Sequence, residues 1–384
     1  MASSNVPAGI AWPVQFCVFI TLSTYVASLI TSNVSHVDRL WTFLPTIYTA
    51  YYALLPLWPH SQPFYLFPYA PKALGHDIFR DFSPRAVLML SLVVLWMFRL
   101  SYNTWRRGLF SLSDEDYRWA VLRTKVPPWF FQVVNISFIA ITQNILLLML
   151  ALPSASAAIL QPHDALSAFD YLLAGFALIV LGIEFTADNQ QFAYHSYKHA
   201  YLAREKGSKS VQPYDANKQW PGSRLNWTPA DAKRGFITRG LWAWSRHPNF
   251  ACEQTFWWII TLFPLLARSP PNLPSPSPDM LLKAITHPSS HLKPLILHWF
   301  PEILHLIPAA SLSLLFFSST LFTESISKNK YYEAYSAYQQ RVGMFLPKGT
   351  VEKALFIKLF KSDQEARRID NLVWGNVENV KKMQ

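Results

Sequence analysis

The stretch WFFQVVNISFIAITQNILLLMLAL, residues 129–152, contains no Asp, Glu, Lys or Arg. Its 24 residues would form an α-helix about 36 Å long at 1.5 Å per residue, and the hydrocarbon core of a bilayer is roughly 30 Å thick. A helix on the surface of a soluble protein carries polar residues along one face, because that face meets water. The stretch therefore predicts a membrane-spanning helix.

Similar apolar stretches recur along the 384-residue chain, separated by polar connections. Only 15% of the residues are charged, against roughly a quarter in a typical soluble domain. We predict an all-α fold, a polytopic transmembrane helix bundle of about seven spans. The predicted spans lie near residues 10–31, 39–58, 84–100, 129–152, 166–186, 250–267 and 296–322.

The distribution of Lys and Arg predicts how this bundle is oriented. If the N-terminus is non-cytosolic, the cytosolic connections and tail hold 27 of these residues and the opposite side holds six. The positive-inside rule favours this orientation, which places the C-terminus in the cytosol. A nucleic-acid-binding protein would instead gather its positive charge on one soluble domain, so we assign the net charge of +11 to a membrane surface and expect no nucleic acid.

We expect a single transmembrane domain over residues 1–350 and a basic cytosolic tail over residues 351–384. The connection 187–249 is rich in charged residues and is expected to fold back over the cytosolic mouth of the bundle. The connection 268–294 is rich in Pro and Ser and is expected to be an unstructured, non-cytosolic insertion. The chain's two cysteines lie in separate apolar stretches without clustered ligands, so we expect no metal.

Polar residues at the start of the sixth predicted span form the first candidate site, SRHPNFACE at 245–253. Pro248 suits the first position of a helix, whose free N–H groups can bind phosphate beside Arg246. Arg246, Asn249 and Glu253 share one helix face. A carboxyl inside the membrane needs a partner, and we expect Glu253 to find it in Arg246 or in a ligand hydroxyl. The same residues can equally serve as an interfacial anchor with a structural ion pair.

Three further polar groups follow helical spacing. Glu184, Asp188, Gln191 and His195 make a stripe that leaves the fifth predicted span. Glu324, Lys328, Tyr331, Tyr335 and Tyr338 lie on one face after the seventh. Arg99, Tyr102, Asn103 and Arg106 surround the end of the third. Each group also has an ordinary explanation, because helices become polar where they leave a membrane and tyrosines form interfacial belts.

The segment LWAWSRHPNFACEQ, residues 241–254, resembles the steroid 5α-reductase C-terminal superfamily in its microbial and fungal membrane branch. Sterol C14 reductases and trans-2-enoyl-CoA reductases are more distantly similar. The resemblance covers roughly residues 36–350, in blocks whose order and spacing agree. The blocks are DRLWTFLP from Asp38, RLSYNTWRRG from Arg99, ADNQQ from Ala187, SRHPN from Ser245, and Glu324-Ser325 with the tyrosines that follow.

The resemblance implies an NADPH-dependent reductase that holds its cofactor between the cytosolic ends of the last helices and their loops. The positions that it implies for cofactor binding are Asp188, Arg246, Asn249, Glu253, Tyr331 and Tyr338, to which we add Gln191 and His247 from the same groups. Ala251-Cys252 stands where relatives commonly have a bulkier residue followed by glycine. The approach of the backbone to the cofactor is therefore expected to differ.

The predicted reaction is hydride transfer from NADPH to the β-carbon of an unsaturated lipid or sterol-like substrate whose carbonyl an acid polarises. Tyr102 is the predicted acid and Glu253 a second catalytic residue, with Tyr48, Tyr51 and Tyr52 as rivals of Tyr102. The protein would position the reactants, exclude water and stabilise the developing enolate.

Two other functions stay open at this point. Isoprenylcysteine and phospholipid methyltransferases share an Arg-His-Pro motif before a membrane helix and bind S-adenosylmethionine, but they typically carry Glu-Glu where this chain has Glu324-Ser325. A lipid-binding protein without turnover could use the same fold.

The chain ends with Lys381-Lys382-Met383-Gln384. Two lysines at these distances from a cytosolic C-terminus resemble the dilysine retrieval signal of endoplasmic-reticulum membrane proteins. We therefore predict a multi-pass protein of the endoplasmic-reticulum membrane.

Overall fold

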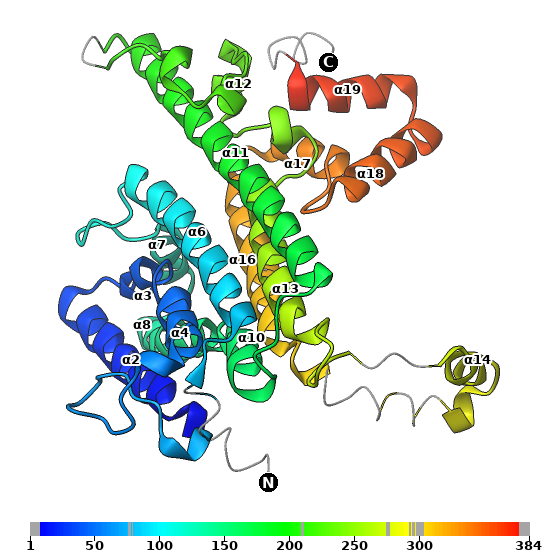
Figure 1. Ribbon diagram of the computed structural model, residues 1–384. Coiled ribbons are helices and arrows are strands. Elements are labelled where there is room, and N and C mark those ends of the chain that lie inside the picture. The colour runs from blue at the N-terminus through cyan, green and yellow to red at the C-terminus, as the bar shows by residue number, and fades with distance from the viewer. Residues whose placement is uncertain are drawn as a thin grey trace. The chain divides into compact units, whose positions relative to one another are not determined.

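The computed structural model describes residues 8–75, 78, 80–208, 211–273, 277–291, 293, 296 and 303–375 (Figure 1). Within these residues all regular structure is helical, which confirms the predicted all-α fold. The helices that carry most of the chain are α2 (Ala11–Thr31), α3 (His36–Leu40), α4 (Leu44–Ala53), α6 (Pro84–Arg106), α7 (Tyr117–Lys125), α8 (Pro128–Val134), α9 (Gln143–Met149), α11 (Ala168–Glu205), α12 (Pro229–Arg234), α13 (Pro248–Leu265), α14 (Pro278–Thr286), α16 (Ile307–Lys330), α17 (Tyr332–Arg341), α18 (Pro347–Phe360) and α19 (Asp363–Trp374).

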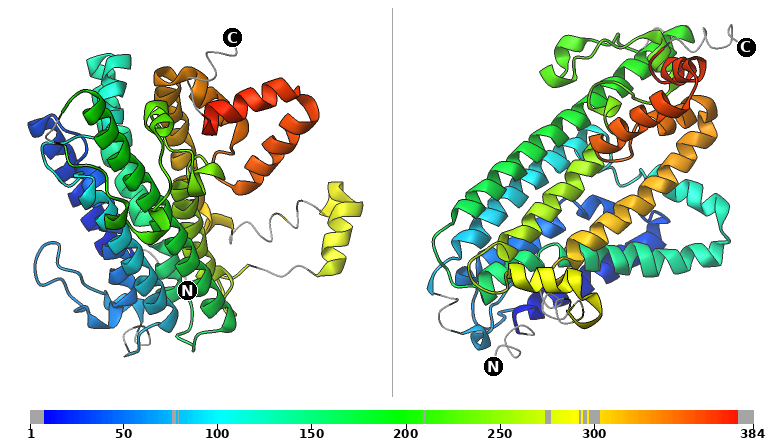
Figure 2. Two further views of the ribbon diagram at one scale, coloured as in Figure 1. Left: turned by 90° about the horizontal axis from the view of Figure 1, so that it is seen from above. Right: turned by 90° about the vertical axis from the view of Figure 1, so that its right-hand side faces the viewer.

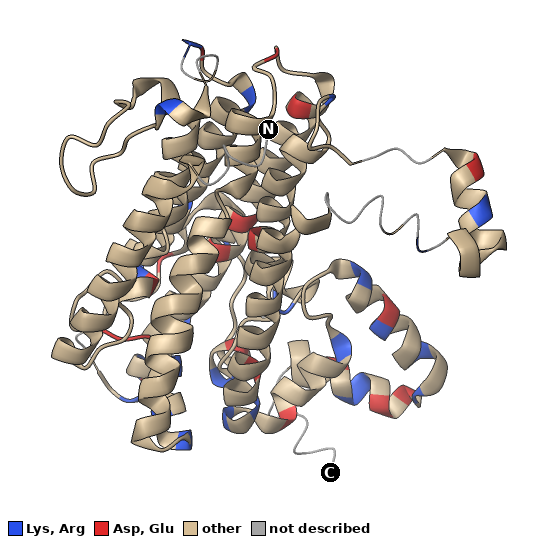
Figure 3. Cartoon of the chain, turned by 90° about the horizontal axis from the view of Figure 1, so that it is seen from below, with Lys and Arg blue, Asp and Glu red and all other residues tan. Residues whose placement is uncertain are grey.

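Five helical segments among the described residues are long and apolar enough to cross a membrane. They are Ala11–Thr31, Pro84–Arg106, Pro128–Leu160, Ala168–Glu205 and Ile307–Lys330. They coincide with the first, third, fourth, fifth and seventh predicted spans, and Figure 3 shows long uncharged stretches along the helices. The chain is therefore a polytopic helical membrane protein.

The second and sixth predicted spans correspond to shorter helices. α4 has 10 residues, so it covers about 15 Å, half of a hydrocarbon core. α13 has 18 residues and carries Pro264 just before its end. The count of seven spans and their orientation stay predictions.

The helix of the fifth predicted span continues past residue 186, as the polar stripe to His195 predicted, and α11 reaches Glu205 with 38 residues. One expectation about the connections is wrong. Part of the Pro- and Ser-rich connection, expected to be unstructured, forms the helix α14. Ser277 caps α14 by accepting a hydrogen bond from the backbone N–H of Met280 at 3.2 Å, and Asp279 pairs with Lys283 one turn later at 2.8 Å. This local chemistry favours a helix in spite of the composition.

The chain divides into two compact units, one of residues 1–178 and 256–313, the other of residues 179–255 and 314–384. In the first unit Arg85 on α6 forms a buried, two-bond ion pair with Asp170 on α11, at 2.7 and 3.1 Å. Arg85 also donates to the side chain of Gln161 at 3.0 Å. These bonds join the membrane helices α6 and α11 where neither charge meets water.

In the second unit α18 and α19 form two arms that meet at residues 361–362 and contact α17 (Figures 1 and 2). Buried apolar side chains hold the three helices together: Tyr335, Ala337, Tyr338, Val342, Ile357, Ile369, Leu372 and Val373. The segment expected to be a basic tail thus forms, as far as residue 375, part of this compact unit.

Candidate functional site

Arg246 lies just before α13 in the second unit, and its side chain is buried. The guanidinium donates two hydrogen bonds to the carboxylate of Glu324 on α16, Nε to Oε1 at 2.7 Å and Nη2 to Oε2 at 3.0 Å. Its Nη1 donates to the carbonyl oxygen of Val342. The parallel two-bond geometry is a strong form of contact between arginine and a carboxylate. Arg246 is thus engaged by partners of its own chain.

Glu324 is the centre of this cluster and is only 3% exposed. Besides Arg246, it accepts a hydrogen bond from Gln339 at 2.8 Å, and Nε2 of His247 lies 2.9 Å from its Oε1. Burial lowers the pKa of His247, although its hydrogen bond to Glu324 acts in the opposite direction. The Glu324 carboxylate accepts the Nε2–H of His247, and Arg246 supplies the counter-charge of Glu324.

Main-chain hydrogen bonds fix the backbone around the cluster. The N–H groups of residues 246–247 donate to the carbonyl oxygens of residues 343–344, at 2.9 and 3.0 Å. From α18, Thr350 Oγ1 donates to the carbonyl of Trp244 at 2.6 Å, and Lys353 Nζ donates to the carbonyl that follows α17 at 3.1 Å. Burial lowers the pKa of Lys353. α18 therefore supports the segment that carries Arg246.

The start of α13 also contacts α11. The helix begins at Pro248, as predicted. Asn249 Nδ2 donates to Asp188 Oδ1 at 3.2 Å, and Asn249 Oδ1 accepts from the backbone N–H of Phe250 at 3.0 Å. Asp188 and Asn249 are both buried. The structure thus brings together two residues that the sequence separates by a long connection.

Gln190 on α11 fixes the loop that leads to Arg246. Its Oε1 accepts from the backbone N–H of Leu241 at 2.9 Å, and its Nε2 donates to the carbonyl of Gly222 at 3.0 Å. Gly240 has a φ of 64°, and a Cβ there would overlap the amide of Gln190. The close approach of the loop therefore requires glycine at this position.

Tyr331 and Tyr338 hold the same loop from the other side. Tyr338 donates its hydroxyl hydrogen to the carbonyl of Trp242 at 2.5 Å, and burial raises the pKa of Tyr338 well above its usual range. The ring of Tyr331 lies against Gly235, whose φ is 91°, and packs on Phe236. Both tyrosines bind to the protein's own loop.

Asp231 forms a second charged cluster with the C-terminal part of the unit. It accepts from Arg234 Nη1 and Arg239 Nε, each at 2.7 Å, and from both donors of Thr228, at 2.9 and 2.8 Å. The Arg234 side chain is 0% exposed and also donates to the carbonyls of Leu372 and Gly375 at the end of α19. Asp231 therefore helps to attach α19.

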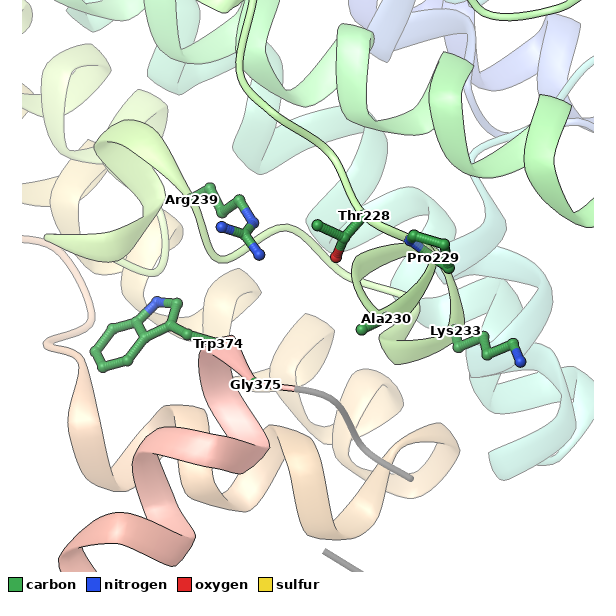
Figure 4. A pocket seen from close by; sticks show the side chains of 7 residues that line it. All are labelled: Thr228, Pro229, Ala230, Lys233, Arg239, Trp374 and Gly375. Carbon is green, nitrogen blue, oxygen red and sulfur yellow. The ribbon is translucent and has the colours of Figure 1, made fainter. Parts of the chain in front are cut away.

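An open cavity of about 350 Å³ adjoins this cluster (Figure 4). Its lining consists of Thr228, Pro229, Ala230, Lys233, Arg239, Trp374 and Gly375. Lys233 and Arg239 bring two positive charges to it, and Trp374 brings an aromatic ring. Arg239 shares its charge with Asp231, whereas Lys233 meets Glu205 at 3.4 Å with both side chains well exposed.

The remaining predicted site residues are more dispersed. Arg246 was one of two partners expected for Glu253, the other being a ligand hydroxyl, but the ion pair of Arg246 is with Glu324 on α16. The expectation compared residues on one helix face and could not include a partner on another helix. Glu253 is buried on α13, and Gln191 is half-buried on α11. Tyr102 lies on α6 and belongs to the first unit, whereas the other predicted site residues belong to the second.

Among the four candidate tyrosines of the first unit, Tyr102 is the exposed one, at 45%. Tyr48, Tyr51 and Tyr52 are each at most 1% exposed on α4, and Tyr51 donates its hydroxyl hydrogen to the carbonyl of Tyr69. A substrate dissolved in the membrane reaches an exposed side chain without opening the core.

The sequence did not single out several residues that organise the second unit. Gln190, Asp231, Gln339 and Lys353 all form buried or half-buried contacts around the two clusters. Asp231 had a local signal, because Thr228-Pro-Ala-Asp231 forms a capping box at the start of α12. Gln190 lies in the ADNQQ block of the resemblance, although only its neighbours Asp188 and Gln191 were named as site residues. Gln339 and Lys353 had no signal, since their partners lie on other elements.

These features define a polytopic membrane protein whose second unit contains two buried charged clusters. The chain belongs to the family described as "Protein of unknown function (DUF1295)", which matches residues 24–278. It is 30% identical over 321 residues to "Uncharacterized protein C594.04c" of Schizosaccharomyces pombe, which covers 84% of this chain and 74% of the yeast protein. No solved structure matches the chain.

Proposed function

We propose that the protein is an NADPH-dependent reductase of a carbon–carbon double bond conjugated to a carbonyl in a steroid-like or other membrane lipid. The proposal rests on the resemblance of the SRHPN segment and its companion blocks to the steroid 5α-reductase superfamily. The spanning helices support it, because they give a lipid substrate direct access from the bilayer.

The basic cavity in the second unit is the observation that carries the cofactor assignment. Lys233 and Arg239 line it together with Trp374. NADPH is strongly anionic and contains planar rings, which suits two cations beside an indole. S-adenosylmethionine carries a positive sulfonium and lacks phosphate, so the same charges disfavour it. This contrast favours the reductase over the methyltransferase.

The proposal changes the role of Arg246. A guanidinium that is buried and neutralised by Glu324 is not available as a phosphate ligand. We therefore assign phosphate binding to Lys233, whose side chain is 40% exposed, with Arg239 beside it, which pairs with Asp231 but is 31% exposed. Arg246 is assigned to positioning the loop between η8 (Gly240–Ala243) and α13. Asp188 and Asn249, which bind each other, act in the same way on the start of α13.

Lys233 and Arg239 would hold NADPH, which when bound would supply a hydride for the β-carbon of the substrate. The chain's own part is to orient the lipid, exclude water and deliver a proton to the enolate. Tyr102 is the residue that we propose for the proton, because it is 45% exposed on a membrane helix.

We further propose that the protein resides in the endoplasmic-reticulum membrane with a cytosolic C-terminus. The charge asymmetry of the sequence supports the orientation. Lys381 and Lys382, which prompted the assignment to this membrane, lie outside the described residues.

The purified protein in detergent is expected to be stabilised against heat by NADPH more than by NADH. Lys233→Gln is expected to weaken NADPH binding about tenfold, since a hydrogen bond to a charged group is worth roughly 1.5–3 kcal/mol. Binding of NADH, which lacks the 2′-phosphate, should change little. Both are measured as the shift in melting temperature against cofactor concentration.

The matched control is Lys218→Gln, which removes an exposed lysine of the same unit outside the cavity. It should leave both cofactors unaffected. Stabilisation by S-adenosylmethionine with no response to NADPH would contradict the proposal. Binding of NADPH without oxidation in the presence of any enone lipid would support the non-catalytic alternative.

Tyr102→Phe is expected to lower kcat for enone reduction by about 10²–10⁴-fold, the usual contribution of a general acid. Cofactor binding should be retained, because the substitution removes one hydroxyl from an exposed side chain. Tyr171→Phe, an exposed tyrosine on α11, is the control. Unchanged turnover in Tyr102→Phe would exclude this residue as the proton donor.

A further inference from the structure

The helix α18 carries apolar residues on two opposite faces. Its inner face includes Thr350 and Ile357, both buried, and the half-buried Ala354. Ile357 belongs to the apolar cluster that joins α18 to α17 and α19. This face accounts for the attachment of the helix to the second unit.

The outer face of α18 is apolar as well, and it is exposed. Val351, Leu355 and Leu359 follow a spacing of four residues and are 48%, 53% and 71% exposed. Phe356 and Phe360 extend this face and are 54% and 70% exposed. Five large apolar side chains within three turns form a patch of a kind that normally marks a contact surface.

The neighbouring helix α19 shows how a surface helix of this unit usually behaves. Its apolar residues Ile369, Leu372 and Val373 are buried in the cluster with α17, and its outer positions Arg367 and Arg368 are exposed. Figure 3 shows charged bands along this part of the chain. Water thus suits the outer face of α19, but not that of α18.

We propose that α18 lies in the plane of the membrane interface, with the outer face of Val351, Leu355, Phe356, Leu359 and Phe360 inserted at the boundary between headgroups and acyl chains. A helix that presents apolar residues to the bilayer and lysines to the headgroups binds in this way.

The bilayer is the expected contact of the outer face, because the same unit contains a membrane helix. α18 follows the membrane helix α16 after residues 331–346, within the same unit. The part of α16 in this unit exposes Leu314, Phe317 and Leu321, which are 67%, 47% and 48% exposed, as expected for a membrane-spanning helix. A membrane helix in the same unit thus brings the bilayer within the chain's own reach of α18.

The charges on α18 fit a membrane surface. Lys348 lies on the outer face in the first turn of α18 and pairs with Glu352 on the same face at 3.6 Å, Lys358 is exposed beside Val351 at the edge of the face, and Lys361 follows the end of the helix. Long lysine side chains can keep their ammonium groups among the headgroups while their stems lie along apolar surface. Anionic headgroups attract such lysines, and Glu352 is the acidic residue of this helix.

Insertion of α18 would have a consequence for the Arg246 cluster. The inner face of the same helix supplies Thr350 and Lys353, which hold the backbone next to Arg246 and at the end of α17. A helix held in the interface therefore keeps this cluster at a fixed depth beside the membrane. The inference does not depend on the identity of the cofactor.

The test places a photo-crosslinker on each arm of the α18–α19 pair in the full-length protein. Leu359→p-benzoylphenylalanine reports on the outer face of α18, and Arg367→p-benzoylphenylalanine on the outer face of α19. Both positions are exposed, so neither substitution removes a buried contact. The variants are reconstituted in nanodiscs of phosphatidylcholine and phosphatidylserine, irradiated, and analysed by intact mass.

We expect adducts of phospholipid mass at position 359 in several-fold excess over position 367. An adduct of dimer mass at position 359 would overturn the proposal, because a second copy would then cover the face. A yield of lipid adduct at position 359 no higher than that at position 367 would also overturn it, because the face would then be open to water. Phe356→p-benzoylphenylalanine should repeat the result for position 359.

Discussion

Glu324→Ala is expected to destabilise the protein by about 3–5 kcal/mol, the usual cost of removing one partner of a buried ion pair. Arg246 would keep its charge in a site where it is 5% exposed, and His247 and Gln339 would lose their acceptor. The change is measured as the loss of melting temperature in detergent, together with the yield of monodisperse protein. Arg246→Ala should have a similar effect, since it strands the carboxylate.

Two controls distinguish the loss of the ion pair from a loss of stability that any substitution in this region would cause. Glu333→Ala removes an exposed carboxylate from α17 and should change stability by no more than about 0.5 kcal/mol. The double variant Arg246→Met/Glu324→Leu replaces both charges by apolar groups and should recover much of the lost stability. If both single variants had the melting temperature of the wild type, the pair would contribute little to the stability of the fold.

The membrane helices were the most predictable part of the fold. Residues 129–152 and the other long apolar stretches have to be helical in a bilayer, because their backbone groups find no other partners there. The end of α11 was less predictable. The polar stripe predicted that the helix continues to His195, but not that it reaches Glu205. On this part of α11, Asp188 accepts a hydrogen bond from Asn249 on α13, and Gln190 accepts one from the backbone N–H of Leu241.

The candidate site was predictable in its residues and not in its pairs. The SRHPN segment identified Arg246, but helical periodicity compares a residue only with its own helix, and it therefore suggested Glu253. The actual partner, Glu324, lies 78 positions away on another helix. Asp231 and α19 illustrate the same limit, because Arg234 reaches carbonyls at residues 372 and 375. Such pairs form when different helices pack together, and the spacing of residues along one sequence does not reveal which helices meet.

Asp231→Ala is expected to cost about 3–5 kcal/mol at pH 7, since Arg234 is fully buried and would lose its counter-charge. The capping box of α12 and the bond to Arg239 would be lost as well. The contacts that Arg234 makes at the end of α19 would weaken. We expect α19 to become accessible to protease in this variant before the rest of the unit.

The effect of Asp231→Ala should depend on pH in a defined direction. Burial by itself would raise the pKa of Asp231, but hydrogen bonds from Arg239, Arg234 and Thr228 outweigh it and hold the pKa below its usual range. The native state therefore binds the Asp231 proton more weakly than the unfolded state. The stabilisation is fully present above the unfolded pKa, near pH 4, and is lost as the pH falls through the lowered folded value.

The gap in melting temperature between wild type and Asp231→Ala should therefore be constant from pH 7 to about pH 5 and shrink below about pH 4. Asp370→Ala is the matched control, because Asp370 pairs with Arg341 at 3.0 Å but is 53% exposed. An exposed pair contributes about 0–1 kcal/mol. If Asp370→Ala destabilised the protein as much as Asp231→Ala, burial of the Asp231 cluster would not be the source of its stability.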